Sequence, residues 1–259
     1  YISEYYQAFE DAVYATDSNG IYTGYNAETG KYYYDYVDVD SLVKIFLIQE
    51  LGLNPDGFIS SLYFYKDADG KMYAGPVWDQ DMTLGTGWTK YLGTNITDYH
   101  YLAEALIKIP DFKKRVSEYF NDTFKPMIIE KIAEDGQIDQ NYAVLKDNAQ
   151  MNYVLWDYIR VGDPSNENHI WQDATYESVI VNMKEWIEAR LSVMENNLAI
   201  KNGDVNLDGK IDSSDAVAIL RYVAGYTDEY FVVEYGDYNN DGQVNSSDSV
   251  AILRHLAGY

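Results

Sequence analysis

The C-terminal part of the chain contains one segment twice. Residues 204–226 read DVNLDGKIDSSDAVAILRYVAGY and residues 237–259 read DYNNDGQVNSSDSVAILRHLAGY, and 15 of the 23 aligned positions are identical. In both copies a polar stretch rich in Asp, Asn and Gly precedes an apolar stretch. Two copies of one pattern predict two similar structural units, so this duplication constrains the fold more than any other feature of the sequence.

Each polar stretch has the spacing of a calcium-binding loop. Oxygen-bearing side chains occupy loop positions 1, 3, 5, 9 and 12, glycine occupies position 6, and position 7 offers its backbone carbonyl. Hard oxygen ligands at alternate positions can enclose Ca²⁺, and the glycine permits the sharp turn. The first predicted ligand set is Asp204, Asn206, Asp208, Lys210 through its backbone, Asp212 and Asp215, and the second is Asp237, Asn239, Asp241, Gln243 through its backbone, Asn245 and Asp248.

These two loops predict two Ca²⁺ ions as cofactors. Turns rich in Asp, Asn and Gly also precede helices without any metal, because these residues cap and turn the backbone, but two loops in register favour calcium. Position 12 carries Asp instead of the usual Glu, which gives a shorter ligand arm. The first loop has four carboxylates and the second has three, so we expect the first to bind Ca²⁺ more tightly.

The apolar stretch after each loop predicts a short helix. Val217, Leu220 and Ala224 recur at helical spacing, as do their counterparts in the second copy, and a glycine ends each stretch. A helix before each loop, as in a complete EF-hand, is not evident from the sequence.

Residues 202–259 resemble a type I dockerin module. That resemblance implies calcium-dependent binding to a cohesin domain of a scaffoldin, and therefore an extracellular cellulosome component. It places the partner-binding residues at Ser213, Ser214, Leu220 and Arg221 in the first copy and at Ser246, Ser247, Leu253 and Arg254 in the second. These residues are identical in the two copies, so we expect either copy to be able to meet the cohesin. The serine pairs can also cap the helices, and the two roles are compatible.

The composition excludes several partners. Asp and Glu number 42 against 19 Lys and Arg, a formal net charge of −23, which repels phosphate backbones and anionic membrane surfaces. We therefore expect no nucleic-acid and no membrane partner, and a monomer apart from the cohesin. The chain has no cysteine, which agrees with an extracellular location.

Residues 1–200 contain no repeat and are predicted to form one domain. Apolar periodicity predicts helices over residues 41–52 after a cap at Asp40, 101–109, 110–124 and 175–200. Between the first two, residues 60–81 predict a β-hairpin around the turn DADG. If Lys66 faces Lys71, Ser60 pairs with Val77, and this register brings residues 56–61 beside Asp79.

This part of the chain resembles the CotH family, whose members are atypical kinases similar to spore coat protein H. The segments YVDVDSLVKIFLIQELGLNPDG, YFYKDADGKMYAGPVWDQDMTLG and WIEARLSVMENNL carry the resemblance. It implies that Asp56 is the catalytic residue, that Asp79 binds Mg²⁺, and that Asp81 supports it. Ser61 stands where the kinase pattern has a metal-binding Asn, and Ser is the weaker ligand.

The resemblance also implies a missing half. No glycine-rich phosphate loop and no nucleotide-binding Lys precede Asp56, so residues 1–200 correspond to a second lobe only. We expect no ATP-dependent activity from these 259 residues by themselves. The predicted fold class is α+β: a mainly helical domain like a kinase C-lobe with a β-hairpin over residues 1–200, then a small all-α dockerin with two EF-hand-like calcium loop-helix repeats over residues 202–259.

Three functional hypotheses remain open at this point. The chain could dock to a cohesin and carry a kinase-fold remnant with a structural or binding role. It could belong to an active atypical kinase that uses Mg²⁺ and ATP in a full-length parent. It could also be a glycan-binding or glycoside-active cargo in polysaccharide degradation, since aromatic residues are frequent. Without the family resemblance, Asp56 and Asp79 would be interpreted as ordinary turn residues.

Overall fold

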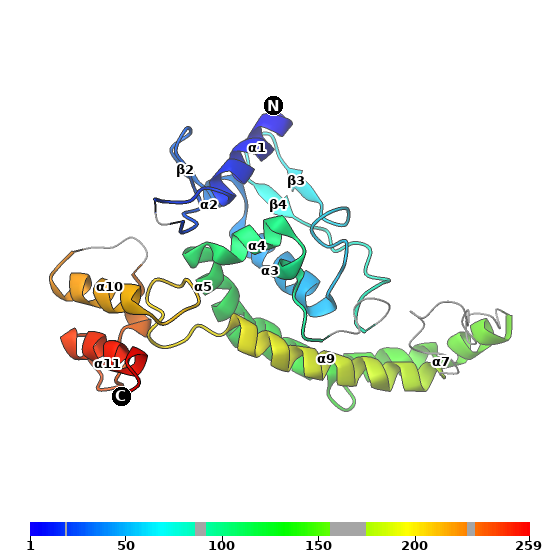
Figure 1. The fold of residues 1–259 in the computed structure, drawn as a ribbon. Helices are drawn as coiled ribbons and strands as arrows, with labels where there is room; N and C mark the ends of the chain where they lie inside the picture. The colour runs from blue at the N-terminus through cyan, green and yellow to red at the C-terminus, as the bar shows by residue number, and fades with distance from the viewer. Residues whose placement is uncertain (19, 86–91, 156–174, 227–230) are drawn as a thin grey trace. The chain divides into compact units, whose positions relative to one another are not determined.

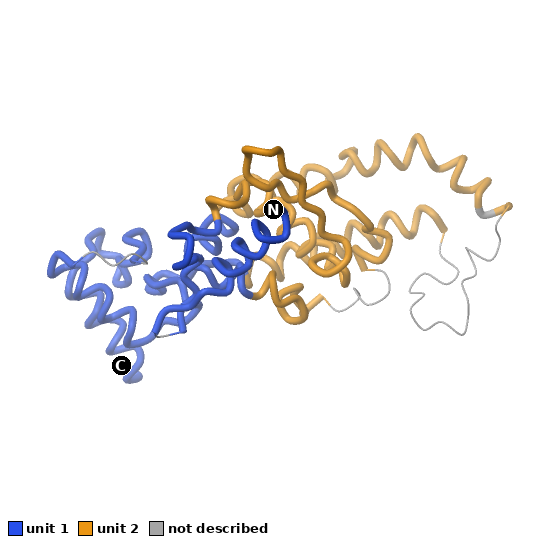
Figure 2. The backbone as a smooth tube through the Cα atoms, turned by 90° about the horizontal axis from the view of Figure 1, so that it is seen from above, with its two compact units in different colours: residues 1–33, 105–117, 198–259 blue, residues 34–104, 118–197 orange. Residues whose placement is uncertain are grey.

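A computed structural model describes residues 1–259 except 19, 86–91, 156–174 and 227–230. The structure is mainly helical with two small antiparallel sheets (Figure 1), which confirms an α+β fold in outline. It divides into two compact units, coloured separately in Figure 2. Unit 1 comprises residues 1–33, 105–117 and 198–259, and unit 2 comprises residues 34–104 and 118–197. The predicted domain boundary near residue 201 stays a prediction.

The elements follow one another along the chain in a fixed order. Unit 1 contains α1 (Ile2–Val13), β1 (Tyr25–Asn26), β2 (Lys31–Tyr32), most of α5 (Pro110–Tyr119), α10 (Ser213–Val223), η4 (Val233–Tyr235) and α11 (Ser246–Leu256). Unit 2 contains most of α2 (Tyr33–Tyr36), α3 (Val39–Gly52), β3 (Phe64–Lys66), β4 (Met72–Ala74), η2 (Ile96–Asp98), the start of α4 (Tyr101–Lys108), the π-helix η3 (Phe120–Phe124), α6 (Lys125–Ile132), α7 (Gln137–Leu155) and nearly all of α9 (Tyr176–Leu198). Among the described residues, no helix is both long enough and apolar enough to cross a membrane.

In unit 1, α10 and α11 pack against each other and share a small core. Val205, Ala216, Ile219 and Ile252 are fully buried in it. Both predicted helices are confirmed, and both begin in the same way. Asp212 and Asn245 are the N-caps, and each closes a capping box with the Asp three residues later. The serine pairs are therefore not the capping residues, because the side chain before each pair already accepts the helical N–H groups.

In unit 2, α3 is the central helix. Its side chains are buried on nearly all sides, including Leu42, Phe46 and Leu47. The predicted cap at Asp40 is wrong: Asp38 is the N-cap, and its Oδ1 accepts the Ser41 amide at 2.9 Å. Asp40 lies inside the first turn, where its negative charge still suits the positive end of the helix.

The hairpin exists, but its predicted register is wrong by one residue. Lys66 pairs with Met72, not with Lys71, and Phe64 pairs with Ala74. Paired residues lie on the same face of an antiparallel sheet, so this register puts Phe64 with the buried Ala74. It also stacks Tyr65 on Tyr73 on the opposite, exposed face, with ring centroids 5.3 Å apart. The predicted register would have mixed the two faces, which explains why the turn is one residue longer.

A buried arginine joins α9 to α3 in unit 2. Arg190 is fully buried and uses its five N–H groups for five bonds: three to the backbone and side chain of Glu50, and two to the carbonyls of Leu92 and Thr94. The other Glu50 oxygen accepts the Ile96 amide at 3.0 Å. Burial raises the pKa of Glu50 to about 7, although Arg190 opposes that shift. The pair is stable there because every polar group in it is bonded.

Replacing this arginine should destabilise the protein strongly. Arg190→Met fills similar volume but leaves Glu50 and two backbone carbonyls buried without their donor, so we expect a loss of about 3–5 kcal/mol in the free energy of unfolding. Urea denaturation followed by far-ultraviolet circular dichroism measures it. Arg115→Met is the control, because Arg115 pairs with Asp111 in a half-exposed contact and should cost less than about 1 kcal/mol. Equal losses in the two variants would contradict the central role of Arg190.

Candidate functional site

The two repeated loops in unit 1 have the same backbone conformation. Loop position 4 has a left-handed φ of 59° in both copies, at Leu207 and Asn240. Loop position 6 has φ of 90° and 87°, at Gly209 and Gly242. Glycine adopts such values without steric cost, whereas Leu207 does so only because its loop requires it. The repeated sequence therefore folds into a repeated backbone.

The predicted calcium ligands bind backbone N–H groups of their own loops, at matching positions in the two copies. Position 1 accepts the amide of the glycine at position 6, at 3.0 Å to Asp204 and 2.8 Å to Asp237. Position 12 accepts the amides of positions 3 and 9 in both copies, through Asp215 and Asp248. Both of these position 12 carboxylates are fully buried. The oxygen atoms are thus held around each loop by bonds that the two copies share.

Burial and nearby negative charge raise the pKa of two carboxyl groups in the first loop. The pKa of Asp215 rises to about 6, first because of burial and then because Asp204 and Asp208 carry like charges nearby. Burial also raises the pKa of Asp204, although Lys113 opposes that shift. A bound cation would relieve this repulsion.

One atom in the first loop tests whether a cation fits. Asp204 is 1% exposed, and its Oδ1 has no hydrogen-bond partner. A buried carboxylate oxygen without a donor is costly, and a metal ion is one of the few groups that can satisfy it. No group of three or more His, Cys, Asp or Glu side chains within the described part of the chain is arranged to hold a metal. The predicted ligands of each loop also include Asn side chains and a backbone carbonyl, which that criterion does not count. This set of oxygen ligands fits Ca²⁺, although its carboxylates accept hydrogen bonds from backbone amides in this structure.

A second candidate site lies in unit 2, where the turn after α3 meets the segment after β4. The helix ends in Leu53, which has a left-handed φ of 51°. Asp56 follows in an exposed turn, and its carbonyl accepts the amides of residues 59–61. Ser61 is buried, and its Oγ donates to Oδ2 of Asp79 at 3.3 Å. The structure thus brings together Ser61 and Asp79, as the sequence predicts, despite the shifted hairpin register.

Asn54 holds this site together, and the sequence analysis missed it. This side chain is 1% exposed; its Oδ1 accepts the Asp56 amide at 3.0 Å, and its Nδ2 donates to the Asp79 carbonyl at 3.1 Å. Nε2 of His100 lies 3.3 Å from the Asn54 carbonyl, and burial lowers the pKa of His100. An Asn-Pro pair just after a helix is typical of a turn in which the Asn side chain accepts the backbone amide two residues later. That sequence signal could have identified Asn54.

The remaining predicted residues are less constrained. Asp79 itself has a left-handed φ of 58°, which an Asp tolerates better than most side chains. Asp56, Asp79 and Asp81 are all exposed. In the described residues no bond connects Asp81 to Ser61 or Asp79. The oxygen atoms at this site could contact a divalent cation or a hydroxyl group, and they are accessible to a ligand.

The comparison with protein families identifies the larger part of the chain. The model of the family described as CotH kinase protein matches residues 3–194. The chain belongs to the CotH kinase protein family. No curated protein and no solved structure matches it. Both the Asp56 turn and the Arg190 ion pair lie within the CotH segment, whereas the two repeated loops follow it.

Family membership does not test the other predictions. The dockerin resemblance concerns residues after the CotH segment and stays a prediction, as do the two Ca²⁺ ions and the cohesin partner. The roles of Asp56, Asp79 and Asp81 also stay predictions. Of the five Trp residues that motivated the glycan hypothesis, Trp88, Trp156 and Trp171 lie outside the described residues. Trp78 is exposed beside Tyr63, and one exposed pair does not define a sugar cleft.

Proposed function

We propose that this CotH family chain is an extracellular cellulosome component that docks onto a cohesin domain of a scaffoldin through its two calcium loop-helix repeats. Its CotH segment then has a structural or binding role. The observation that carries the proposal is that the two loops share backbone conformation and hydrogen bonds. Each is followed by a helix that exposes the same serine pair, leucine and arginine. A duplicated surface of this kind suits one partner that can meet either copy.

The exposed face of each helix supports a partner of this type. Leu220 is 44% exposed and Leu253 is 45% exposed, and Arg221 and Arg254 beside them are also exposed. Each leucine belongs to a stripe of exposed apolar side chains. The first stripe consists of Val217, Leu220 and Val223 on α10 with Tyr226 just after it, and the second consists of Val250, Leu253 and Leu256 on α11 with Tyr259 just after it. Exposed apolar stripes at matching positions are typical of a protein interface.

The second serine of each pair couples the loop to this face. Ser214 accepts a hydrogen bond from the Asn206 side chain at 3.0 Å, and Ser247 accepts the equivalent bond from Asn239 at 2.8 Å. Asn206 and Asn239 are predicted calcium ligands at loop position 3. Ordering of these side chains by Ca²⁺ would therefore also orient the serines at the start of each helix. This coupling gives calcium a direct physical route to the partner surface.

A lysine distinguishes the first loop from the second. Nζ of Lys113, on α5 in the same unit, lies 3.3 Å from Oδ2 of Asp204 and donates to the Leu207 carbonyl at 3.1 Å. Within the described residues no cation contacts Asp237, the corresponding residue of the second loop. An ammonium group that already neutralises Asp204 competes with Ca²⁺ for it. This contact opposes the tighter first-loop binding that the carboxylate count predicts.

A second candidate function is an active atypical kinase in a longer parent chain, with Mg²⁺ and ATP. The hydrogen bond between Ser61 and Asp79 supports it, because two oxygen-bearing side chains in contact suit a shared divalent cation. Asp56 would then accept the proton of the acceptor hydroxyl, and Asp79 would hold Mg²⁺.

Calcium removal should abolish docking. We expect the chain to bind a type I cohesin in 1 mM CaCl₂ and to lose at least 100-fold in affinity in excess chelator, measured by isothermal titration calorimetry. Replacing Ser213, Ser214 and Arg221 together by Ala should leave binding within a few-fold, because the second copy remains. The same changes at both copies should abolish it. Full binding in chelator would refute the proposal.

Removal of Lys113 should strengthen calcium binding at the first loop. Loss of a charge-assisted hydrogen bond to Asp204 frees that ligand, so Lys113→Met should raise the first-loop affinity about 3- to 10-fold. Calcium titrations of chains carrying Asp237→Ala isolate this loop. Lys114→Met is the matched control, since Lys114 pairs with Glu234 outside the loop and should change the affinity less than twofold. An unchanged affinity in Lys113→Met would show that the lysine does not compete.

The kinase candidate has its own test. A full-length parent with that activity should transfer labelled phosphate from ATP in Mg²⁺. Asp79→Ala should lower the rate roughly 100-fold, because loss of even an outer-shell partner of a metal ligand costs about 10- to 100-fold. Asp81→Ala is the comparison, and we expect a smaller effect because Asp81 lacks a bond to Ser61. Transfer that is unaffected by Asp79→Ala would exclude this role for Asp79.

A further inference from the structure

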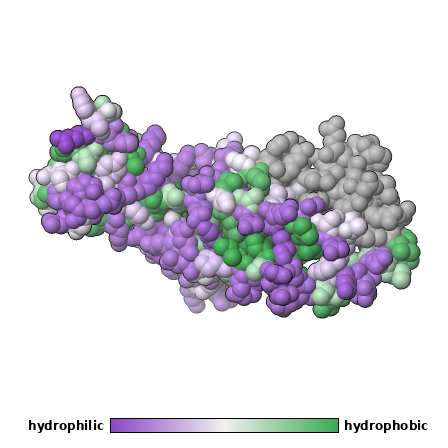
Figure 3. Space-filling model, turned by 90° about the horizontal axis from the view of Figure 1, so that it is seen from below, coloured by the Kyte–Doolittle hydropathy of each residue, from purple (hydrophilic) through white to green (hydrophobic). Residues whose placement is uncertain are grey.

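Unit 2 contains an apolar groove that neither candidate function uses. It encloses about 740 Å³ between α6, α7 and α9. Its apolar lining includes Ile129, Ile132, Ile180, Val181 and Leu191. Figure 3 shows apolar patches bordered by hydrophilic residues on the face that it presents. The groove belongs to the CotH segment, and it lies apart in sequence from both Asp79 and the calcium loops.

The walls of the groove are incompletely covered. Helix α6 has the sequence KPMIIEKI, and none of its side chains is buried. Ile129 is 47% exposed, and Val181 across the groove on α9 is 48% exposed. Burial of such side chains releases roughly 25 cal/mol per Å² of apolar surface, so a partner that covers them gains affinity. A gathering of half-exposed aliphatic side chains in a hollow is typical of a binding surface.

The charges around the groove specify the partner. The two lysines that line it are already paired: Lys125 with Glu195, and Lys184 with both oxygens of Asp139 at 2.7 and 2.9 Å. Glu177, Glu185 and Glu188 also line the groove, and within the described residues these three have no cationic partner. The rim therefore carries a surplus of negative charge that the described residues do not neutralise.

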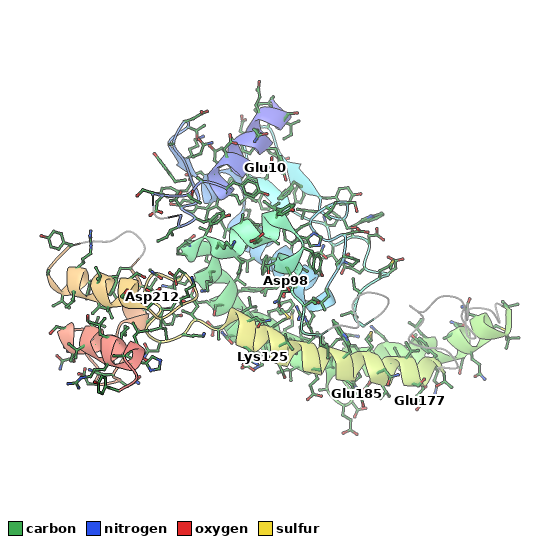
Figure 4. The ribbon with its side chains drawn as sticks, viewed as in Figure 1. Glu10, Asp98, Lys125, Glu177, Glu185 and Asp212 are labelled. Atoms are coloured by element: carbon green, nitrogen blue, oxygen red, sulfur yellow. The ribbon has the colours of Figure 1, made fainter. Side chains whose placement is uncertain are left out.

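Glu177 and Glu188 lie at the two ends of one face of α9, and Glu185 lies beside that face. Glu177, Val181, Lys184 and Glu188 are spaced by four, three and four residues, which is the spacing of one helical face. Figure 4 shows Glu177 and Glu185 following one another along this helix. From Glu177 to Glu188 the helix rises about 16 Å, which is about three helical turns. An acidic row of that length matches an extended ligand better than a small molecule.

We propose that this groove docks an amphipathic helix of a partner protein, with an apolar stripe that enters the groove and Lys or Arg residues that pair with the glutamates of α9. Helices that lie in apolar grooves through residues three and four apart are a common mode of recognition. A second copy of this chain is disfavoured as the occupant, because its net charge of −23 would be repelled by the same acidic row. The proposal does not depend on calcium docking or on kinase activity.

The test uses a designed 18-residue peptide of Leu and Lys that forms one apolar and one basic helical face. We expect it to bind the intact chain in 0.15 M NaCl, measured by fluorescence anisotropy, and to protect residues 129–133 and 180–192 from amide hydrogen exchange. A peptide of the same composition, scrambled so that it has no apolar face, should bind at least tenfold more weakly. Equal binding of the two peptides would show attraction to the charge alone and would overturn the proposal.

Matched charge reversals locate the site. Glu185→Lys with Glu188→Lys should lower the affinity for the designed peptide at least tenfold, because two attractions become repulsions. The control is Glu4→Lys with Glu28→Lys, which changes the net charge by the same amount at exposed positions in unit 1. This control should change the affinity for the peptide less than twofold. Similar losses of affinity in both variants would overturn the proposal. It would also be overturned if light scattering showed a dimer of the chain that is lost only in the Glu185→Lys, Glu188→Lys variant. Circular dichroism verifies that the variants are folded.

Discussion

The CotH segment depends on one buried arginine. Arg190 binds the carbonyl and the carboxylate of Glu50, in the last turn of α3, and two carbonyls of the segment that precedes η2. These partners are more than ninety residues away in the sequence. Because all five guanidinium N–H groups are used, the arginine fixes both position and orientation of the end of α3. The candidate site follows directly from there, since Leu53 and Asn54 come after this turn.

Asn54 transmits that fixed position to the two candidate aspartates. Its side chain binds the Asp56 amide and the Asp79 carbonyl, so two turns that are separate in sequence are held by one amide group. An amide can donate and accept at the same time, whereas a carboxylate in this position could only accept. The exposed carboxylates can therefore differ in role while the backbone beneath them stays in place. This arrangement would serve a binding surface as well as a catalytic one.

The repeated loops rest on a different principle, which is local. The loop carboxylates accept hydrogen bonds from nearby backbone amides. The position 12 carboxylate of each loop also lies, buried, in the first turn of the following helix. The loop conformation is thus tied to the helix whose outer face carries the exposed leucine and arginine. Position 1 nevertheless differs between the copies: Lys113, which comes from α5 and not from the repeat, contacts Asp204. Oδ1 of Asp237 accepts the Asp241 amide, whereas Oδ1 of Asp204 has no hydrogen-bond partner. A shared loop pattern in two copies therefore does not guarantee equal affinity, because the neighbouring residues differ.

The sequence by itself determined the features that depend on near neighbours: the two loops with their glycines, the helices after them, the hairpin and the amphipathic helices of residues 101–124 and 175–200. Spacing of a few residues decides these, since the interacting groups are close along the chain. Only the tertiary structure decided the hairpin register, the bond from Asn54 to the Asp79 carbonyl and the role of Arg190. The register followed because the buried side chains of both strands must lie on the same face of the hairpin. The polar side chains bind distant backbone groups because a buried carbonyl needs a hydrogen-bond partner. No local pattern records which distant carbonyl an arginine will meet.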